Sequence, residues 1–234
     1  MKKRLHIVMT LLLFVSIFYL SRQGAALQAE YAASIPASDP PVVVLDAGHG
    51  NIDPGKVGAD GALEKEINLS ITQCLKEYLE ESGVTVVLTR KDDSPLYKET
   101  DSNKKRGDMS TRIAIIEEAD PAIVVSIHQN SYPDSSVSGP QVFYYSASKE
   151  GKSLAETIQK SFSYAVEEKK IRTAKANQDY YLLIHTPCPT VICECGFLSN
   201  PEECAKLQQE EYQKKVAWSV YLGIMEYLNL PVNQ

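Results

Sequence analysis

The sequence VVVLDAGHGNIDPG, residues 42–55, joins an uninterrupted apolar run to a turn-rich segment that contains one histidine. Such a run is typical of a strand buried on both faces, as in a parallel sheet covered by helices. His49 follows this run and stands between Gly48 and Gly50. Glycine lets the backbone turn sharply and leaves room for a close approach. We therefore expect His49 to reach a ligand just beyond the strand.

Helical periodicity and apolar runs alternate along the rest of the chain. Helices are predicted over 64–82, 110–119, 150–166 and about 212–228, with another opened by Asn200 and Pro201. Further strands are predicted over 84–89, 122–127, 141–145, 180–184 and 191–195, and a long charged loop over 90–107. This alternation predicts an α/β fold with a mostly parallel sheet. Ligands of such sheets bind at the carboxyl ends of the strands.

The N-terminal residues have a different character. Three basic residues at 2–4 precede an apolar run over 7–20, and small residues follow it. This order predicts a secretory signal peptide over 1–26, with an uncleaved membrane anchor as the alternative. Residues 27–40 are small, polar and proline-bearing, and are predicted to link this segment to a single domain over 41–230. Both alternatives predict that the domain works outside the cytoplasm.

The charge of the domain argues against a polyanionic partner. The chain has a net charge of −6, and residues 1–26 hold four basic side chains and no acidic one, so their removal leaves −10. A surface of this sign repels nucleic acid at long range. The sequence predicts no nucleic-acid partner, and contact with a membrane only through the N-terminal segment if it is not cleaved.

A second histidine occupies a position equivalent to that of His49. His128, in the sequence SIHQNS, follows the predicted strand 122–127, so both histidines lie at carboxyl ends of strands. A lone histidine at such a position is more often structural than functional. The histidines therefore need a third group before they indicate a site.

Glu64 supplies that third group. A helix turns by about 100° per residue, which places Glu64 about 20° from Ile71 and on the apolar stripe, whereas Glu66 points elsewhere and suits a solvated partner of the helix dipole. An inward carboxylate needs a charged or hydrogen-bonding partner, and a divalent metal would be one. Two histidines and one glutamate are the protein ligands of a common catalytic zinc site. We predict that His49, Glu64 and His128 bind Zn²⁺.

Glu194, in the sequence VICECGFLSN, is the predicted catalytic residue. Strand alternation puts Glu194 on the face opposite Cys193 and Cys195. A glutamate within an apolar run must be ion-paired, protonated or functional. Hydrolysis of an amide at a zinc site requires a general base, and Glu194 is the residue that we expect to fill this role.

The same region contains the residues of a rival metal site. His185, Cys188, Cys193 and Cys195 have a spacing that resembles structural zinc knuckles only loosely, and paired C-x-x-C motifs are absent. Core packing of Cys193 and Cys195 is the favoured interpretation. We assign no role to His185.

Four motifs together resemble one enzyme family. DAGHGNIDPGKVG (46–58), EKEINL (64–69), SIHQNS (126–131) and ECGFLSNPEE (194–203) resemble the zinc-dependent N-acetylmuramoyl-L-alanine amidases of bacterial cell walls. The likeness runs from about residue 42 to 229, and is greatest to the short sporulation- or germination-specific amidases. It implies a twisted sheet of about six strands flanked by helices, zinc on His49, Glu64 and His128, and Glu194 as the catalytic glutamate.

The resemblance also implies a substrate and a location. The expected reaction is hydrolysis of the amide between N-acetylmuramic acid and L-alanine in peptidoglycan, in spore cortex modification or germination. The expected location is outside the cytoplasm, secreted or anchored at the cell wall or spore cortex. The sequence shows no wall-binding repeats, so we expect targeting to come from the surface of the domain, from a partner protein or from the N-terminal segment.

Two other classes remain open at this point. One is another exported zinc peptidase, such as a carboxypeptidase that acts on cell-wall peptides, because the metal ligands alone do not set the substrate. The other is a non-enzymatic wall-binding module that keeps the fold, which the presence of all four chemical residues disfavours.

Overall fold

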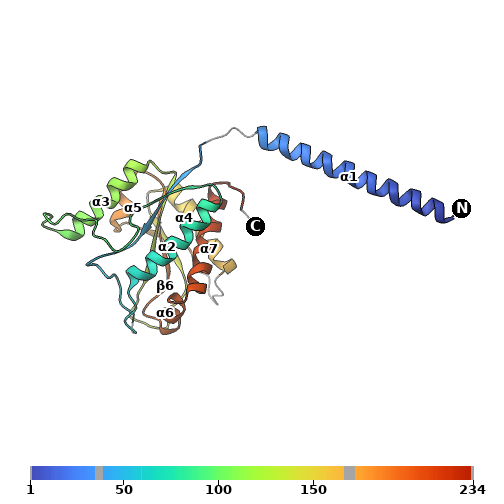
Figure 1. Ribbon diagram of the computed structural model, residues 1–234. Coiled ribbons are helices and arrows are strands. Elements are labelled where there is room, and N and C mark those ends of the chain that lie inside the picture. The colour runs from blue at the N-terminus through green and yellow to red at the C-terminus, as the bar shows by residue number, and fades with distance from the viewer. Residues whose placement is uncertain (1, 35–38, 59, 166–171, 233–234) are drawn as a thin grey trace. The chain divides into compact units, whose positions relative to one another are not determined.

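The computed structural model describes residues 2–34, 39–58, 60–165 and 172–232, and divides the chain into two compact units, Met1–Asp39 and Pro40–Gln234 (Figure 1). Helix α1 (Lys2–Ser34) makes up the described part of the first unit and extends past the predicted boundary at residue 26. Residues 35–38 of the predicted linker lie outside the described residues. Among the helices that the structure describes, none combines the length and the apolarity that a membrane crossing requires.

The second unit contains a six-stranded sheet with the order β2-β1-β3-β6-β4-β5. Its strands are β1 (Val42–Ala47), β2 (Thr85–Leu88), β3 (Ile123–Asn130), β4 (Gln141–Tyr145), β5 (Lys175–Asn177) and β6 (Thr190–Phe197). Every neighbouring pair is parallel except β4 and β6, which are antiparallel. The predicted α/β class with a mostly parallel sheet of about six strands is confirmed.

Helices cover both faces of this sheet. They are α2 (Glu64–Glu81), α3 (Lys104–Ala119), α4 (Lys149–Ala165), α5 (Tyr181–His185), α6 (Pro201–Leu207) and α7 (Glu210–Tyr227). The larger apolar core joins one face to α2, α4 and α7, whereas a smaller cluster joins the other face to α3 and α5 (Figure 1). Val43 and Leu45 belong to the first cluster and Val44 to the second, and all three are fully buried. The opening apolar run is therefore a strand buried on both faces.

One predicted strand is wrong. Residues 180–184 were predicted as a strand, but Tyr181–His185 forms the short helix α5, and the edge strand is β5 instead. Leu182 packs with α3 and β3, while Leu183 packs against Phe143 and Ile192. A short apolar run of this kind is compatible with a strand or with a helix. Its five residues are too few for the periodicity to distinguish the two.

The charged segment before residue 110 is only partly a loop. Helix α3 begins at Lys104, and the side chain of Asn103 caps it by accepting a hydrogen bond from the backbone N–H of Arg106 at 3.0 Å. The run of basic residues at its start concealed the helix, because the first turn lies largely on the surface. Asn200 caps α6 in the same way, with Pro201 in the first turn as predicted.

Candidate metal centre

Three separate elements bring the predicted metal ligands together. His49 follows β1, His128 lies near the end of β3, and Glu64 is the first residue of α2. Strands β1 and β3 are parallel neighbours, so their carboxyl ends meet at one edge of the sheet. One ligand atom from each of the three side chains lies within 4.8 Å of the others. Within the described ranges, no other group of three His, Cys, Asp or Glu side chains comes close enough to hold an ion.

Glu64 is buried and points into this centre, as the helical stripe predicted. Its Oε1 lies 2.9 Å from His128 Nδ1 and 3.2 Å from His49 Nε2, and its Oε2 accepts a hydrogen bond from the backbone N–H of Lys56 at 2.7 Å. Burial raises the pKa of Glu64, but the contacts with His128 and His49 outweigh it and hold the pKa well below its usual range. The carboxylate is therefore charged. Glu66 is exposed, as expected.

The loop that carries His49 has an unusual backbone. His49 has a φ of 62°, in the left-handed region that few non-glycine residues adopt, and Asn51 has a φ of 51°. Two contacts hold this conformation: Arg112 Nη2 donates to the His49 carbonyl at 2.5 Å, and Asp53 Oδ2 lies 3.0 Å from His49 Nδ1. His49 therefore adopts a positive φ itself, in addition to Gly50 beside it.

Gly48 and Gly55 serve the site by being small. A Cβ atom on Gly48 would lie 2.2 Å from His128 Nε2, and one on Gly55 would lie 2.5 Å from Glu64 Oε2. The freedom to turn that the sequence suggested for Gly48 is therefore not its main role. Gly48 leaves space for the imidazole of the neighbouring strand.

A buried ion pair between Asp46 and Arg112 supports the loop that carries His49. Asp46, the penultimate residue of β1, accepts hydrogen bonds from Thr89 and Ser126 at 2.6 Å and from Arg112 Nη1 at 2.5 Å. Burial raises the pKa of Asp46, but the Arg112 guanidinium and the two hydroxyls hold it well below its usual range. Arg90 adds a hydrogen bond from Nη2 to the Gly48 carbonyl at 3.2 Å.

Sequence reasoning missed Asp46, Asp53, Arg90 and Arg112 as parts of this site. The signal for Asp46 was present, since it is a carboxylate at the end of a fully buried run. Its partner Arg112 lies 66 positions away, on a helix whose register the sequence left undefined. Asp53 contacts His49, which precedes it by four residues, because the chain turns between the two. The sequence did not predict this contact.

Glu194 lies on β6, with His128 of β3 as its cross-strand partner. Its side chain is buried, and within the described residues its Oε2 has no hydrogen-bond partner. Burial raises the pKa of Glu194 to about 7, and the negative charge of Glu64 acts in the same direction, although His128 opposes the shift. The structure thus places an unpartnered carboxylate oxygen beside the three clustered side chains.

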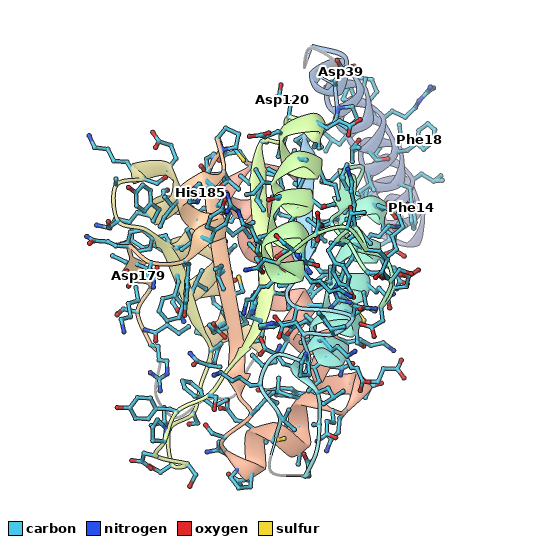
Figure 2. All side chains as sticks on the ribbon, turned by 90° about the vertical axis from the view of Figure 1, so that its left-hand side faces the viewer. Phe14, Phe18, Asp39, Asp120, Asp179 and His185 are labelled. Atoms are coloured by element: carbon cyan, nitrogen blue, oxygen red, sulfur yellow. The ribbon has the colours of Figure 1, made fainter. Side chains whose placement is uncertain are left out.

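The residues of the rival site do not gather. Cys193 and Cys195 are buried in the larger apolar core, as favoured from the sequence, and Cys188 packs with the smaller cluster. His185 ends α5 (Figure 2). Its ring stacks on that of Tyr181, with ring centroids 3.8 Å apart. All five cysteines are free.

A cavity of about 450 Å³ opens beside His49 and His128. Its lining residues include Ile52, Tyr97, Met109 and Tyr181. Two imidazoles and a charged carboxylate at the carboxyl edge of an α/β sheet, with a buried carboxylate next to them and a cavity beside them, are typical of the active site of a metal-dependent hydrolase.

Comparison with known proteins identifies the family. Residues 43–226 match the family described as N-acetylmuramoyl-L-alanine amidase. The chain belongs to this family of cell-wall hydrolases, which the four sequence motifs had indicated.

Individual relatives agree with this assignment. The chain is 34% identical to a germination-specific N-acetylmuramoyl-L-alanine amidase of Bacillus subtilis, over 97% of this chain and 96% of the relative. Among solved structures, it resembles the CwlD amidase from Clostridioides difficile, determined in complex with the GerS lipoprotein, with a TM-score of 0.78 and 42% identity over 81% of this chain and 98% of that one. It also resembles the amidase AmiC2 of Nostoc punctiforme, with a TM-score of 0.71 and 32% identity over 81% of this chain and 97% of that one.

Proposed function

We propose that this amidase hydrolyses the bond between N-acetylmuramic acid and L-alanine of peptidoglycan, with zinc bound by His49, Glu64 and His128 and with Glu194 as the general base. The observation that carries the proposal is the unpartnered Oε2 of Glu194, buried beside His128. A buried carboxylate oxygen without a partner costs free energy. A water molecule or the amide nitrogen of a substrate would supply the missing partner.

The donor set fits zinc. Imidazole nitrogen and carboxylate oxygen bind zinc at about 2.0–2.2 Å, and a catalytic site of this type keeps one position for water or substrate. The close grouping of His49, Glu64 and His128 supplies the three protein ligands. The contact between Asp53 and His49 Nδ1 is of the kind that orients metal-binding histidines and makes them better ligands.

Zinc in such a site supplies Lewis-acid activation of the scissile carbonyl and of a water molecule. Glu194 accepts the proton of the attacking water at Oε2 and passes a proton to the amino group of L-alanine as it leaves. The closed packing around Glu194 excludes bulk water from the carboxylate, so that the proton stays within the site. Arg112 and Asp53 keep His49 in position during the reaction.

Digestion of intact peptidoglycan tests this function. The wild-type protein should release whole stem peptides that begin with a new L-alanine amino group. The Glu194→Gln variant should bind zinc normally and lose hydrolysis, whereas Glu202→Gln, on the exposed surface of α6, should keep full activity.

Other products would contradict the proposal in different ways. Shortened stem peptides with the muramyl amide intact would indicate a carboxypeptidase. Binding without any product would indicate a wall-binding module. A fully active Glu194→Gln variant would remove Glu194 from the mechanism and leave the reaction itself standing.

The biological setting is part of the same proposal. The similarity to a germination-specific amidase supports spore cortex peptidoglycan as the substrate, and the similarity to an amidase in complex with a lipoprotein supports a partner protein. Both similarities support the proposal that the chain acts outside the cytoplasm, secreted or anchored at the cell wall or spore cortex. The spore-specific role would be contradicted if the protein hydrolysed cortex and vegetative peptidoglycan at equal rates, both alone and in the presence of a partner protein.

A further inference from the structure

The structure contains a second cavity, of about 490 Å³. Tyr180 lines both cavities. Asn130, which lines the second cavity, follows His128 by two positions on β3, and Gln141 is the cross-strand partner of Glu194. The second cavity therefore begins within one or two residues of the reacting groups.

The second cavity is basic. Arg172 and Lys175 line it, and among the residues that the structure describes no aspartate or glutamate does. The Arg172 guanidinium lies 4.9 Å from the centre of the Phe197 ring, and Lys175 Nζ lies 5.7 Å from that of Phe143. Arg172 is also fixed by a hydrogen bond from Nε to the Ser138 carbonyl at 2.8 Å. We call this space the basic cavity.

The first cavity has a different charge balance. Its two lysines each lie near a carboxylate: Lys104 Nζ is 3.5 Å from Glu99, and Lys105 Nζ is 3.7 Å from Asp53. Asp108 lines the same cavity. An anion that entered there would meet carboxylates as well as ammonium groups, so the attraction would largely cancel.

The proposed reaction joins two chemically unlike arms at the metal centre. One arm is the uncharged sugar with its lactyl group, and the other is a peptide, which carries carboxylate at its end and on any acidic side chain. The two arms extend in opposite directions from the scissile amide. The arm with carboxylates is attracted to the cavity with uncompensated positive charge.

We propose that the basic cavity binds the carboxylate groups of the stem peptide through Arg172 and Lys175, and so sets which side of the metal centre the peptide occupies. This inference rests on the proposed amidase function. Arg172 and Lys175 are specificity residues that act on binding. They lie on or beside the edge strand β5, away from the metal ligands.

A matched pair of substrates tests the inference. Two N-acetylmuramoyl peptides of identical sequence are used, one with free carboxylates and one with every carboxylate amidated. The zinc-loaded wild-type chain should have a lower KM for the free peptide. In the double variant Arg172→Gln/Lys175→Gln, the KM for the free peptide should rise about fivefold or more, as expected for the loss of two ion pairs at a partly exposed site, with kcat unchanged. The KM for the amidated peptide should not change.

Two control variants separate charge from packing and one cavity from the other. Arg172→Lys keeps the positive charge and should retain the preference for the free peptide. Lys104→Gln/Lys105→Gln removes two charges from the first cavity and should also retain it.

The inference is overturned if the wild-type protein has equal KM values for the two peptides, or if the preference disappears in the Lys104→Gln/Lys105→Gln variant instead. Both results would leave the amidase function intact, because the peptides would still be cleaved. Failure of the wild-type protein to cleave either peptide would overturn the proposed function, and this inference with it.

Discussion

The guanidinium of Arg112 and the carboxylate of Asp46 form an ion pair of 2.5 Å in which both side chains are about 2% exposed. The same guanidinium donates to the carbonyl of His49. Asp46 is therefore the anchor, through Arg112, of the loop that carries the proposed metal ligand His49. This pair links the stability of the fold to the geometry of the site.

Replacement of Asp46 by Asn should destabilise the protein strongly. The change removes one of the two carboxylates that pair with Arg112 and leaves Asp108, whose Oδ1 lies 2.7 Å from Arg112 Nε. Breaking a buried ion pair costs about 3–5 kcal/mol in free energy of unfolding, and the remaining contact with Asp108 puts the expected loss near the lower end of this range. Urea denaturation at neutral pH measures it. The control is Glu226→Gln, which removes an ion pair with Lys160 on the surface and should cost less than about 1 kcal/mol. Equal losses in the two variants would contradict the anchoring role.

The contribution of Asp46 should depend on pH. Its pKa in the folded protein is lower than in the unfolded chain, where it is about 3.9. A depressed pKa gives stability that is complete above the unfolded value and is lost as the pH falls below it. The difference in unfolding free energy between wild type and Asp46→Asn should therefore be constant at about pH 5–7 and narrow below about pH 4. If the difference in unfolding free energy between wild type and Asp46→Asn grew as the pH fell, the pKa of Asp46 would not be lowered in the folded protein.

Gly48→Ala should weaken metal binding while the fold persists. The new methyl group would lie 2.2 Å from His128 Nε2 and would push this ligand away from the other two. Zinc affinity measured by competition with a chelator should fall at least about tenfold, within the range for disturbed supporting contacts. Glu202→Gln, on the exposed surface of α6, is the control and should keep the wild-type affinity. Unchanged affinity in Gly48→Ala would show that His128 is not a ligand.

The metal content of the purified chain should be about one zinc per molecule, as three protein ligands at a single centre predict. Both His49→Ala and Glu64→Ala should lose this zinc, because each removes one of the three. His185→Ala should retain it, since His185 stacks on Tyr181 away from the cluster. Elemental analysis measures all four proteins. Zinc that persists in Glu64→Ala would place the metal elsewhere.

The positions of some residues could be predicted from the sequence, because strand patterns and helical rotation depend only on neighbouring residues. The run Val43 to Leu45 has a single reasonable interpretation in an α/β pattern, and the position of Glu64 follows from helical rotation alone. The same rules placed His128 at a strand end. Each of these inferences needs only the neighbouring residues.

Other parts of the site depend on contacts between distant segments. The pairing of Asp46 with Arg112 spans 66 positions and requires the true start of α3, which charged residues concealed. The helix at Tyr181–His185 arises because two consecutive leucines reach two different apolar clusters. Tertiary packing of this kind overrides a short local pattern.

The order of the strands separates the proposed reactive residues from the proposed selectivity residues. His128 and Glu194 lie on the adjacent interior strands β3 and β6, and His49 follows β1, the interior strand beside β3. Arg172 and Lys175 lie at one border of the sheet, where Lys175 begins the three-residue strand β5. Substitutions at the border leave the interior strands paired on both sides. An engineer, or natural variation, could therefore exchange residues 172–180 to admit a different peptide without rebuilding the reactive centre.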